Sequence, residues 1–431
     1  MFLLTMLATP VQAVGLLRDA DLEHGLKQIA APVLRAAGLS PSRVKILIVN
    51  DSTLNAFVVG NDAIFVHYGL INKMDTAAML QAVIAHEAAH IANGHITRRM
   101  TNLANSRTVA GLGAALAAVA AASGSNKAAA GIALGTASSA RRSFLKHTRA
   151  EEASADQSGV RYLKTAGISP EGLLAVLQIF RGQEALSESR QDPYLRSHPL
   201  SRDRIRAAEA FITAYGNTFT ANPTADYWYA RVKGKLSAFT RSPKWTLRRA
   251  GETGYKDVRL LRQAVALHKQ SRTKKALAAI DGAIATRPTD PFLHDLRGQI
   301  LIETRNFGAA VAAYKRAVQL APNDALILAG YGRALLASGN PKQALGVLEK
   351  SRRRDFRDGS MLRDLSVAYA KTGQTGMAAL VTAERYALAG RLKDAGIHAK
   401  RASGLLGQGS GPWQRAQDVL IASERAAKKR R

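Results

Sequence analysis

Two histidines and a glutamate with metal-binding spacing lie in the first quarter of the chain. Residues 85–90 are Ala-His-Glu-Ala-Ala-His, so His86 and His90 stand four residues apart with Glu87 between them. Four residues make about one helical turn, and on a helix both imidazoles would face the same way and could hold one zinc ion. Glu87 would stand beside that ion as the general base for a water molecule. The pattern therefore predicts hydrolysis by an activated water.

The segment that carries these residues is apolar on almost every side. Between Ala77 and Ala92 the only other strongly polar side chain is Gln81. A helix that is apolar all round is a buried one, and a buried carboxylate needs a partner or a metal because an unpaired buried charge is costly. We therefore predict a buried helix from about Thr76 to Asn93 that holds one zinc ion per chain. The alternative is a core helix with two histidines and a chance glutamate.

A second acidic segment lies downstream, at residues 148–156, and is predicted to begin a helix that runs to Ala166. Glu152 and Asp156 stand four residues apart and share one face of that helix. An open catalytic zinc site needs a third protein ligand and a carboxylate that holds a histidine Nδ1–H behind it. The alternative is a solvated helix start, in which Glu151 and Glu152 stabilise the first turn.

Two more histidines lie close to predicted element ends. His198, between Ser197 and Pro199, is predicted in a loop from which it could reach the metal or polarise a substrate carbonyl; the alternative is a surface-turn histidine. His95 follows the helix-ending pair Asn93-Gly94, and we expect it to favour the helix C-terminus electrostatically.

Three short apolar runs precede the predicted zinc helix. The predicted strands are Arg43–Val49, Ala56–Val59 and Ala63–Tyr68, after a helix at Leu16–Ala37 that is broken near Pro32. This order of helix, strands and buried helix predicts an α+β domain. Asn55, Ala56 and Phe57 begin a strand beside the site, and zinc peptidases often bind substrate as an added strand, so they are a candidate substrate edge. An ordinary core strand is the alternative.

Composition limits the classes of function. The chain has no cysteine, which excludes disulfides, cysteine-ligated zinc and a cysteine nucleophile. Its net charge of +29, from 61 Lys and Arg against 32 Asp and Glu, would suit nucleic acid, an anionic membrane surface or acidic proteins. No nucleic-acid-binding motif occurs and only 6% of residues are aromatic, so we predict no nucleic-acid partner. We interpret the charge as an envelope or membrane-surface feature.

Two segments bear on location. Residues 1–13 are predicted to be a secretory signal, because an apolar run precedes the small-residue pattern Val11-Gln12-Ala13; the alternative is a plain apolar N-terminus. Residues 108–140, rich in Ala, Gly and Ser, are predicted to form a hairpin of two helices too weakly apolar to span a bilayer. They either pack as soluble helices or make peripheral membrane contact through 108–142, where Arg141 and Arg142 suit anionic lipid.

From about Asp257 the chain repeats every 34 residues. An alanine recurs at each 34-residue step, and in the first repeats a large residue, a second alanine, a proline and a glycine follow it at fixed distances. The successive repeats contain Ala276, Ile280, Ala283, Pro288 and Gly298; Ala310, Tyr314, Ala317, Pro322 and Gly332; Ala344 and Leu348; and Ala378. This is the tetratricopeptide period, and stacked helix pairs of that kind form a concave protein-binding surface. We predict an all-α solenoid at 257–427, after a metallopeptidase domain at 14–240 and before a basic tail at 428–431.

Together these segments resemble the HtpX-like and CAAX-prenyl-protease-like zinc metallopeptidases, and within them the periplasmic branch with C-terminal tetratricopeptide repeats. The resemblance rests on Leu17-Arg18-Asp19-Ala20, Asn55-Ala56-Phe57, Gly69-Leu70, residues 85–90 with Gly94-His95, Glu152 to Asp156, Ser197-His198-Pro199, and the repeats. It implies a mostly helical, gluzincin-like domain in which His86, His90 and Glu152 hold zinc. It also implies that Asp156 supports a ligand from behind and that His198 lies near the metal and gates it.

The same resemblance implies an endopeptidase that cleaves misfolded or stalled cell-envelope proteins in the periplasm of a Gram-negative bacterium, where it is soluble or membrane-associated. The repeats would dock clients or the outer-membrane assembly machinery. The rival hypothesis is a chaperone-like or scaffold protein with a latent or structural zinc site. Glu87 favours the enzyme, because a structural zinc site has no use for a general base.

Overall fold

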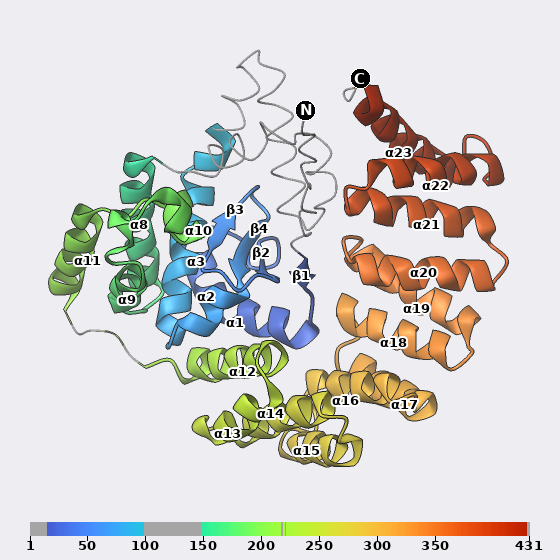
Figure 1. The fold of residues 1–431 in the computed structure, drawn as a ribbon, viewed down its shortest axis with the longest axis horizontal. Helices are drawn as coiled ribbons and strands as arrows, with labels where there is room; N and C mark the ends of the chain where they lie inside the picture. The colour runs from blue at the N-terminus through green and yellow to red at the C-terminus, as the bar shows by residue number, and fades with distance from the viewer. Residues whose placement is uncertain (1–14, 99–147, 217–218, 220, 429–431) are drawn as a thin grey trace, which may run out of the picture.

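The structure is a computed structural model, and it describes residues 15–98, 148–216, 219 and 221–428. Helices dominate it, around one small sheet (Figure 1). The predicted signal at 1–13, the predicted hairpin at 108–140 and all but the first residue of the basic tail lie outside the described residues. Within the described parts, no helix is both long and apolar enough to cross a membrane.

The first part of the chain holds all the strands. Its elements are β1 (Leu16–Leu17), α1 (Ala20–Ala36), β2 (Lys45–Val49), β3 (Ala56–Val58), β4 (Ala63–His67), α2 (Tyr68–Lys73), α3 (Ala77–Ala92), α8 (Arg149–Thr165), α9 (Glu171–Ile179), α10 (Pro193–Ser197) and α11 (Arg202–Tyr215). The rest is helical: α12 (Pro223–Thr240), α13 (Pro243–Arg249), α14 (Lys256–Lys269), α15 (Thr273–Thr286), α16 (Pro291–Glu303), α17 (Phe307–Leu320), α18 (Ala325–Ala337), α19 (Pro341–Arg354), α20 (Gly359–Lys371), α21 (Thr375–Leu388), α22 (Leu392–Leu405) and α23 (Gly411–Lys428).

The sheet has the order β1-β2-β4-β3, with β2 and β4 parallel and the outer pairs antiparallel. Alternate residues face opposite sides: Ile48 and Val66 join the core with α1 and α3, whereas Leu47 and Phe65 form an apolar cluster on the other face. The three predicted strands are confirmed within one or two residues. Leu16–Leu17, predicted as the start of a helix, is instead a strand paired with β2.

Helix α1 is continuous, and the predicted break near Pro32 is wrong. Asp19 caps the helix by accepting a hydrogen bond from the Leu22 amide at 2.9 Å, and Pro32 lies inside it. A proline in a helix interior costs about 3 kcal/mol. Fully buried Leu26, Ile29 and Val33 offset this cost, since each such side chain contributes roughly 1.5–3 kcal/mol.

Helix α3 lies at the centre of this part, packed against α1, α8, α9 and the sheet. The Thr76 side chain accepts a hydrogen bond from the Met79 amide at its start, as the predicted bounds imply, and nearly every residue of the helix is buried. α9 approaches it closely through Gly172, where a Cβ atom would lie 2.4 Å from the Ala78 carbonyl oxygen. Only glycine therefore fits this contact, which fixes one side of the predicted zinc helix.

The helices from α14 to α23 pack as successive antiparallel pairs, as the repeat predicts. Ala276, Ala310 and Ala344, which mark the 34-residue step, are fully buried. A Cβ atom on Gly298 would lie 2.5 Å from the Tyr314 ring, so α16 and α17 can pack this closely only because residue 298 is a glycine. Ala378, in the fourth and more degenerate repeat, is only half-buried.

A buried ion cluster joins the repeats to the sheet-bearing part. Arg231 of α12 is 1% exposed and pairs with Asp21 of α1 at 2.7 Å and with Asp290, just before α16, at 2.5 Å. Lys235, one turn further on, pairs with Asp19 at 2.8 Å. α12 is thus a regular helix that connects both parts.

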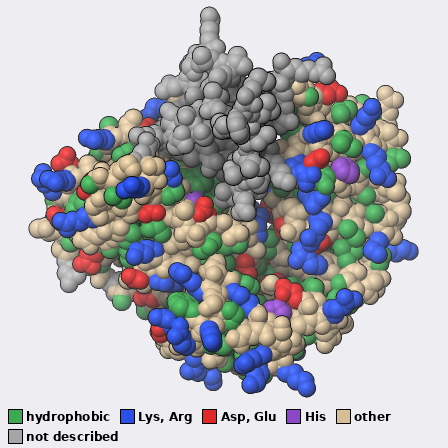
Figure 2. All heavy atoms as spheres, in the orientation of Figure 1, with side chains coloured by type: hydrophobic (Ala, Val, Ile, Leu, Met, Phe, Trp, Pro, Cys, Tyr) green, Lys and Arg blue, Asp and Glu red, His purple; other side chains and the backbone are tan. Residues whose placement is uncertain are grey.

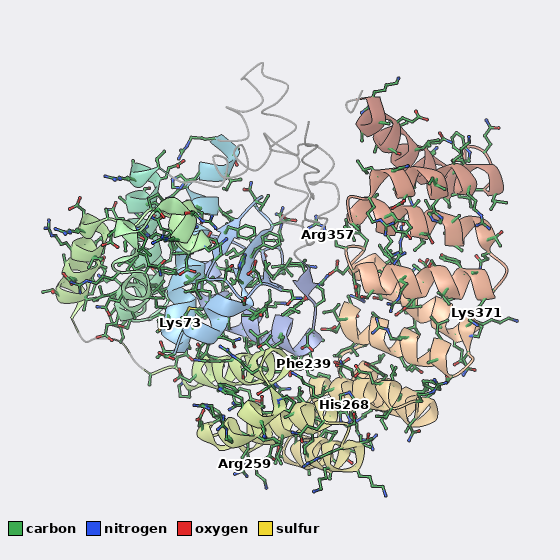
Figure 3. All side chains as sticks on the ribbon, viewed as in Figure 1. Lys73, Phe239, Arg259, His268, Arg357 and Lys371 are labelled. Carbon is green, nitrogen blue, oxygen red and sulfur yellow. The ribbon has the colours of Figure 1, made fainter. Side chains whose placement is uncertain are left out.

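The array then curves back to the sheet (Figure 1). In the loop between α19 and α20, Asp355 pairs with Arg18 at 2.7 Å and with Lys45 of β2 at 3.1 Å. Arg357 of the same loop, labelled in Figure 3, lies beside the sheet and donates to Asp62 at 2.9 Å. The repeats are therefore attached to the sheet-bearing part at two separate places, at α1 and beside the sheet.

Candidate metal centre

Four side chains from three parts of the chain converge in the interior. His86 and His90 of α3, Glu152 of α8, and His198 just after α10 place one ligand atom each within 4.8 Å of one another. The Nε2 atoms of His86 and His90 lie 3.1 Å apart. Glu152 Oε2 lies 3.3 Å from the first and Oε1 lies 3.4 Å from the second. All four residues are at most 2% exposed, so a solvated Glu152 and a surface His198 are both wrong.

The two histidines of α3 are held from behind. His86 Nδ1 lies 2.9 Å from Asp156 Oδ1, and His90 Nδ1 lies 2.8 Å from His95 Nδ1. A hydrogen bond at Nδ1 leaves the Nε2 lone pair of each ring directed at the shared centre, which is how metal-binding histidines are oriented. Asp156 thus contacts the His86 ring on the side away from the shared centre. His95 contacts the His90 ring itself, a role that its position at the helix end did not reveal.

Arg204 of α11 is a residue that the sequence analysis missed. It donates to both carboxylate oxygens of Asp156, at 2.6 and 2.9 Å, and lies 2.7 Å from Glu152 Oε2. Its Nη1 also donates to the Pro199 carbonyl at 3.1 Å, next to His198. It therefore fixes two carboxylates and the segment carrying His198. One indication of such a residue lay in the sequence, since Glu152 and Asp156, if buried, need a cation as partner.

The electrostatics of the centre favour a bound cation. Burial lowers the pKa of His86, but Glu152 and Asp156 outweigh it and raise this pKa to about 10. Burial would raise the pKa of Glu152, yet His198 and Arg204 hold it well below its usual value. Burial also lowers the pKa of His90 well below its usual value. The carboxylates thus favour positive charge at His86, which a bound metal cation would supply in place of a proton, and they leave an ionised carboxylate beside the neutral His90 imidazole.

Buried oxygen atoms without hydrogen-bond partners indicate whether the centre suits a metal ion. Both carboxylate oxygens of Glu87 are buried without a hydrogen-bond partner among the described residues. Buried polar atoms normally have partners, so such a group calls for a bound ion or water. Two imidazole nitrogens and a carboxylate, with an orphaned oxygen beside them, form a donor set that fits a divalent metal.

Glu87 and the edge of the sheet lie next to this centre. Glu87 Oε1 is 3.4 Å from His198 Nε2, and burial raises the pKa of Glu87. His198 Nε2 also lies 3.2 Å from the Ala56 carbonyl oxygen of β3. Ser197 donates to Asn55 Oδ1 at 3.4 Å. β3 is the last strand in the sheet order, so the predicted substrate edge at Asn55–Phe57 is an edge beside the centre.

Comparison with known proteins agrees with this geometry. Residues 17–212 match peptidase family M48, and residues 301–369 match a tetratricopeptide repeat. The chain is 24% identical to the beta-barrel assembly-enhancing protease of Escherichia coli (strain K12) over 388 residues, which cover 88% of this chain and 78% of the relative. The protein of that name from Yersinia pestis is 25% identical over 81% of this chain and 72% of its own length.

A further relative matches less than half of this chain. Metalloprotease LoiP of Escherichia coli (strain K12) is 31% identical over 183 residues, which cover 41% of this chain and 65% of that protein. The chain is a metalloprotease in which residues 17–212 match peptidase family M48 and residues 301–369 match a tetratricopeptide repeat.

Proposed function

We propose that the protein is a zinc-dependent endopeptidase with one zinc ion per chain, held by His86, His90 and Glu152. The observation that carries this proposal is the convergence of their ligand atoms within 4.8 Å of one another and of His198. Two histidines and a glutamate with a further position open are the ligand set of catalytic zinc. Asp156 would support His86 from behind, through the contact at Nδ1.

Glu87 is the proposed general base. When bound, zinc supplies the Lewis acidity that makes a water molecule nucleophilic near neutral pH. The Glu87 carboxylate oxygens, which are 0% exposed and accept no hydrogen bond from the described residues, are available to take a proton from such a water and pass it to the leaving amine. Its raised pKa suits both steps, because it brings the group closer to the working pH.

His198 is the proposed gate of the open position. Its Nδ1 lies 3.1 Å from Glu152 and 3.3 Å from His86, and its Nε2 faces the Ala56 carbonyl of the substrate edge. A peptide added to β3 at Asn55–Phe57 would meet this imidazole, so the ring must move for substrate to bind. His198→Ala should raise the basal cleavage of a denatured protein; unchanged cleavage would contradict the gate.

The clients that we propose are misfolded or stalled cell-envelope proteins, in the periplasm of a Gram-negative bacterium. The printed name of the relatives, beta-barrel assembly-enhancing protease, supports a link to outer-membrane assembly. Figure 2 shows Lys and Arg side chains along the inner edge of the repeat array, the side on which such arrays bind proteins. The limits 14–240 and 257–427 for the two domains, and membrane contact through 108–142, are part of the same proposal.

The test is cleavage of an unfolded model protein by the wild type and by Glu87→Gln, with the zinc content of both measured. We expect about one zinc ion in each and cleavage by the wild type alone. If both proteins hold zinc and neither cleaves, the chaperone-like or scaffold alternative replaces the enzyme. The structural observation in favour of that alternative is that the centre is buried and that His198 lies at its open position. If neither holds zinc, the ligand set is wrong.

A further inference from the structure

A cavity of about 530 Å³ lies between α12, α13 and α14, at the bottom of Figure 1. It reaches the segment that leads into α3, where Thr76 and Ala77 form part of its wall. None of the four residues of the metal centre lines this cavity, and His86 and His90 lie in the second half of the same helix, so the cavity is separate from the metal centre. Its size falls within the roughly 300–1,000 Å³ typical of small-molecule sites.

Arg262 of α14 is a buried charge in the wall of this cavity. It is 6% exposed, its Nη1 donates to the Arg249 carbonyl at 2.7 Å, and its Nε has no hydrogen-bond partner in the part of the chain that the structure describes. Burial lowers the pKa of Arg262, and Arg249 adds to this while Glu252 opposes it. The other deeply buried arginines, Arg204 and Arg231, each have carboxylate partners within 3 Å.

The rest of the wall is basic and aromatic. Arg241 and Arg249 lie over the Trp245 ring, with guanidinium carbons 5.8 and 5.0 Å from its centroid. Two of the acids in the wall are already engaged, Asp75 with Lys233 at 3.4 Å and Glu252 with Arg249 at 3.3 Å. The third acid, Asp226, is exposed. Neither Arg241 nor Arg262 forms an ion pair within the described residues, and both line the same cavity as Trp245.

We propose that this cavity binds an organic anion, with a carboxylate or phosphate group against Arg262 and an apolar body against Trp245. A guanidinium fork matches the geometry of both anionic groups and binds them with charge-assisted hydrogen bonds. The ligand would supply the partner that Arg262 Nε lacks, because buried charges in folded proteins are otherwise paired. The site touches α3, α12, α13 and α14 together, so its occupation stabilises the junction between the peptidase part and the first repeat helices.

Thermal unfolding and calorimetric titration of the full, zinc-loaded chain test this site, at constant ionic strength. The probes are benzoate, phenyl phosphate and inorganic phosphate. We expect at least one aromatic anion to bind and to raise the melting temperature, and the anion that binds more tightly identifies the class as carboxylate or phosphate. Arg262→Gln should weaken its binding at least tenfold. Arg248→Gln, a neighbour on α13 outside the cavity wall, should change it less than twofold.

A charge reversal at an exposed wall residue provides a second variant if Arg262→Gln fails to fold. Arg241 is exposed, so Arg241→Glu should leave the fold intact. It should weaken binding of the aromatic anion at least threefold. Absence of binding by all three probes, or equal binding by wild type and both variants, overturns the proposal. Inorganic phosphate that binds as tightly as phenyl phosphate overturns the apolar contact with Trp245.

Discussion

Replacing Arg204 by Gln should weaken metal binding even though Arg204 is not a proposed ligand. The substitution removes two hydrogen bonds to Asp156, at 2.6 and 2.9 Å, and the 2.7 Å ion pair with Glu152. Arg204 is only 5% exposed, so solvent screens these contacts little. Loss of a residue that orients metal ligands typically lowers metal affinity about 10- to 100-fold, which corresponds to roughly 1.4–2.7 kcal/mol.

The same substitution should destabilise the metal-free chain by about 3–5 kcal/mol, because it leaves buried carboxylates without their counter-charge. The assay is zinc competition against a fluorescent chelator, together with urea unfolding of the metal-free protein. Arg206→Gln is the matched control, since Arg206 lies on the same helix with 73% of its side chain exposed. Metal affinity and stability of Arg204→Gln equal to those of the control would refute the reasoning.

Three further outcomes follow from the structure. Removal of the metal by a chelator should abolish cleavage and lower the melting temperature, and added zinc should restore both; cleavage that survives chelation would contradict the metal requirement. Gly172→Ala should destabilise the chain by about 1–3 kcal/mol through its clash with Ala78, whereas Gly251→Ala, with open space around it, should not, as urea unfolding will show. Burial would raise the pKa of Asp355, but Arg18 and Lys45 hold it at about 2. The stability from this pair is therefore present above the unfolded pKa of about 3.9 and lost as pH falls towards 2, and Asp355→Asn should flatten that part of the urea-midpoint profile.

The parts of the site that depend on helical spacing could be predicted from the sequence. His86 and His90 share a face of α3, and Glu152 and Asp156 share a face of α8, because four residues make about one turn. The apolar surroundings of the first pair also predicted its burial, which the structure confirms. Local geometry of this kind requires no knowledge of the partners across the core.

Arg204 could not be predicted in the same way. Asp203 beside it and Arg206 one half-turn on have 89% and 73% of their side chains exposed, so the segment has the composition of a solvated helix. Which of these charges turns inward depends on how α11 packs on α8. β1 was missed for a similar reason, since its two residues are a strand only through hydrogen bonds with β2, far along the chain.

The two attachments of the repeats bear on how a docked protein would reach the metal centre. Arg231 ties the start of the array to α1, and the Asp355–Arg18 pair ties its middle to the first residues before α1. Both attachments are largely buried, and ion pairs of this kind are costly to break singly. α1 in turn packs directly on α3, the helix that carries two of the proposed ligands. A protein held on the inner side of the array would therefore lie at a fixed distance from the centre, and delivery to Glu87 would depend on movement of His198 rather than of the repeats.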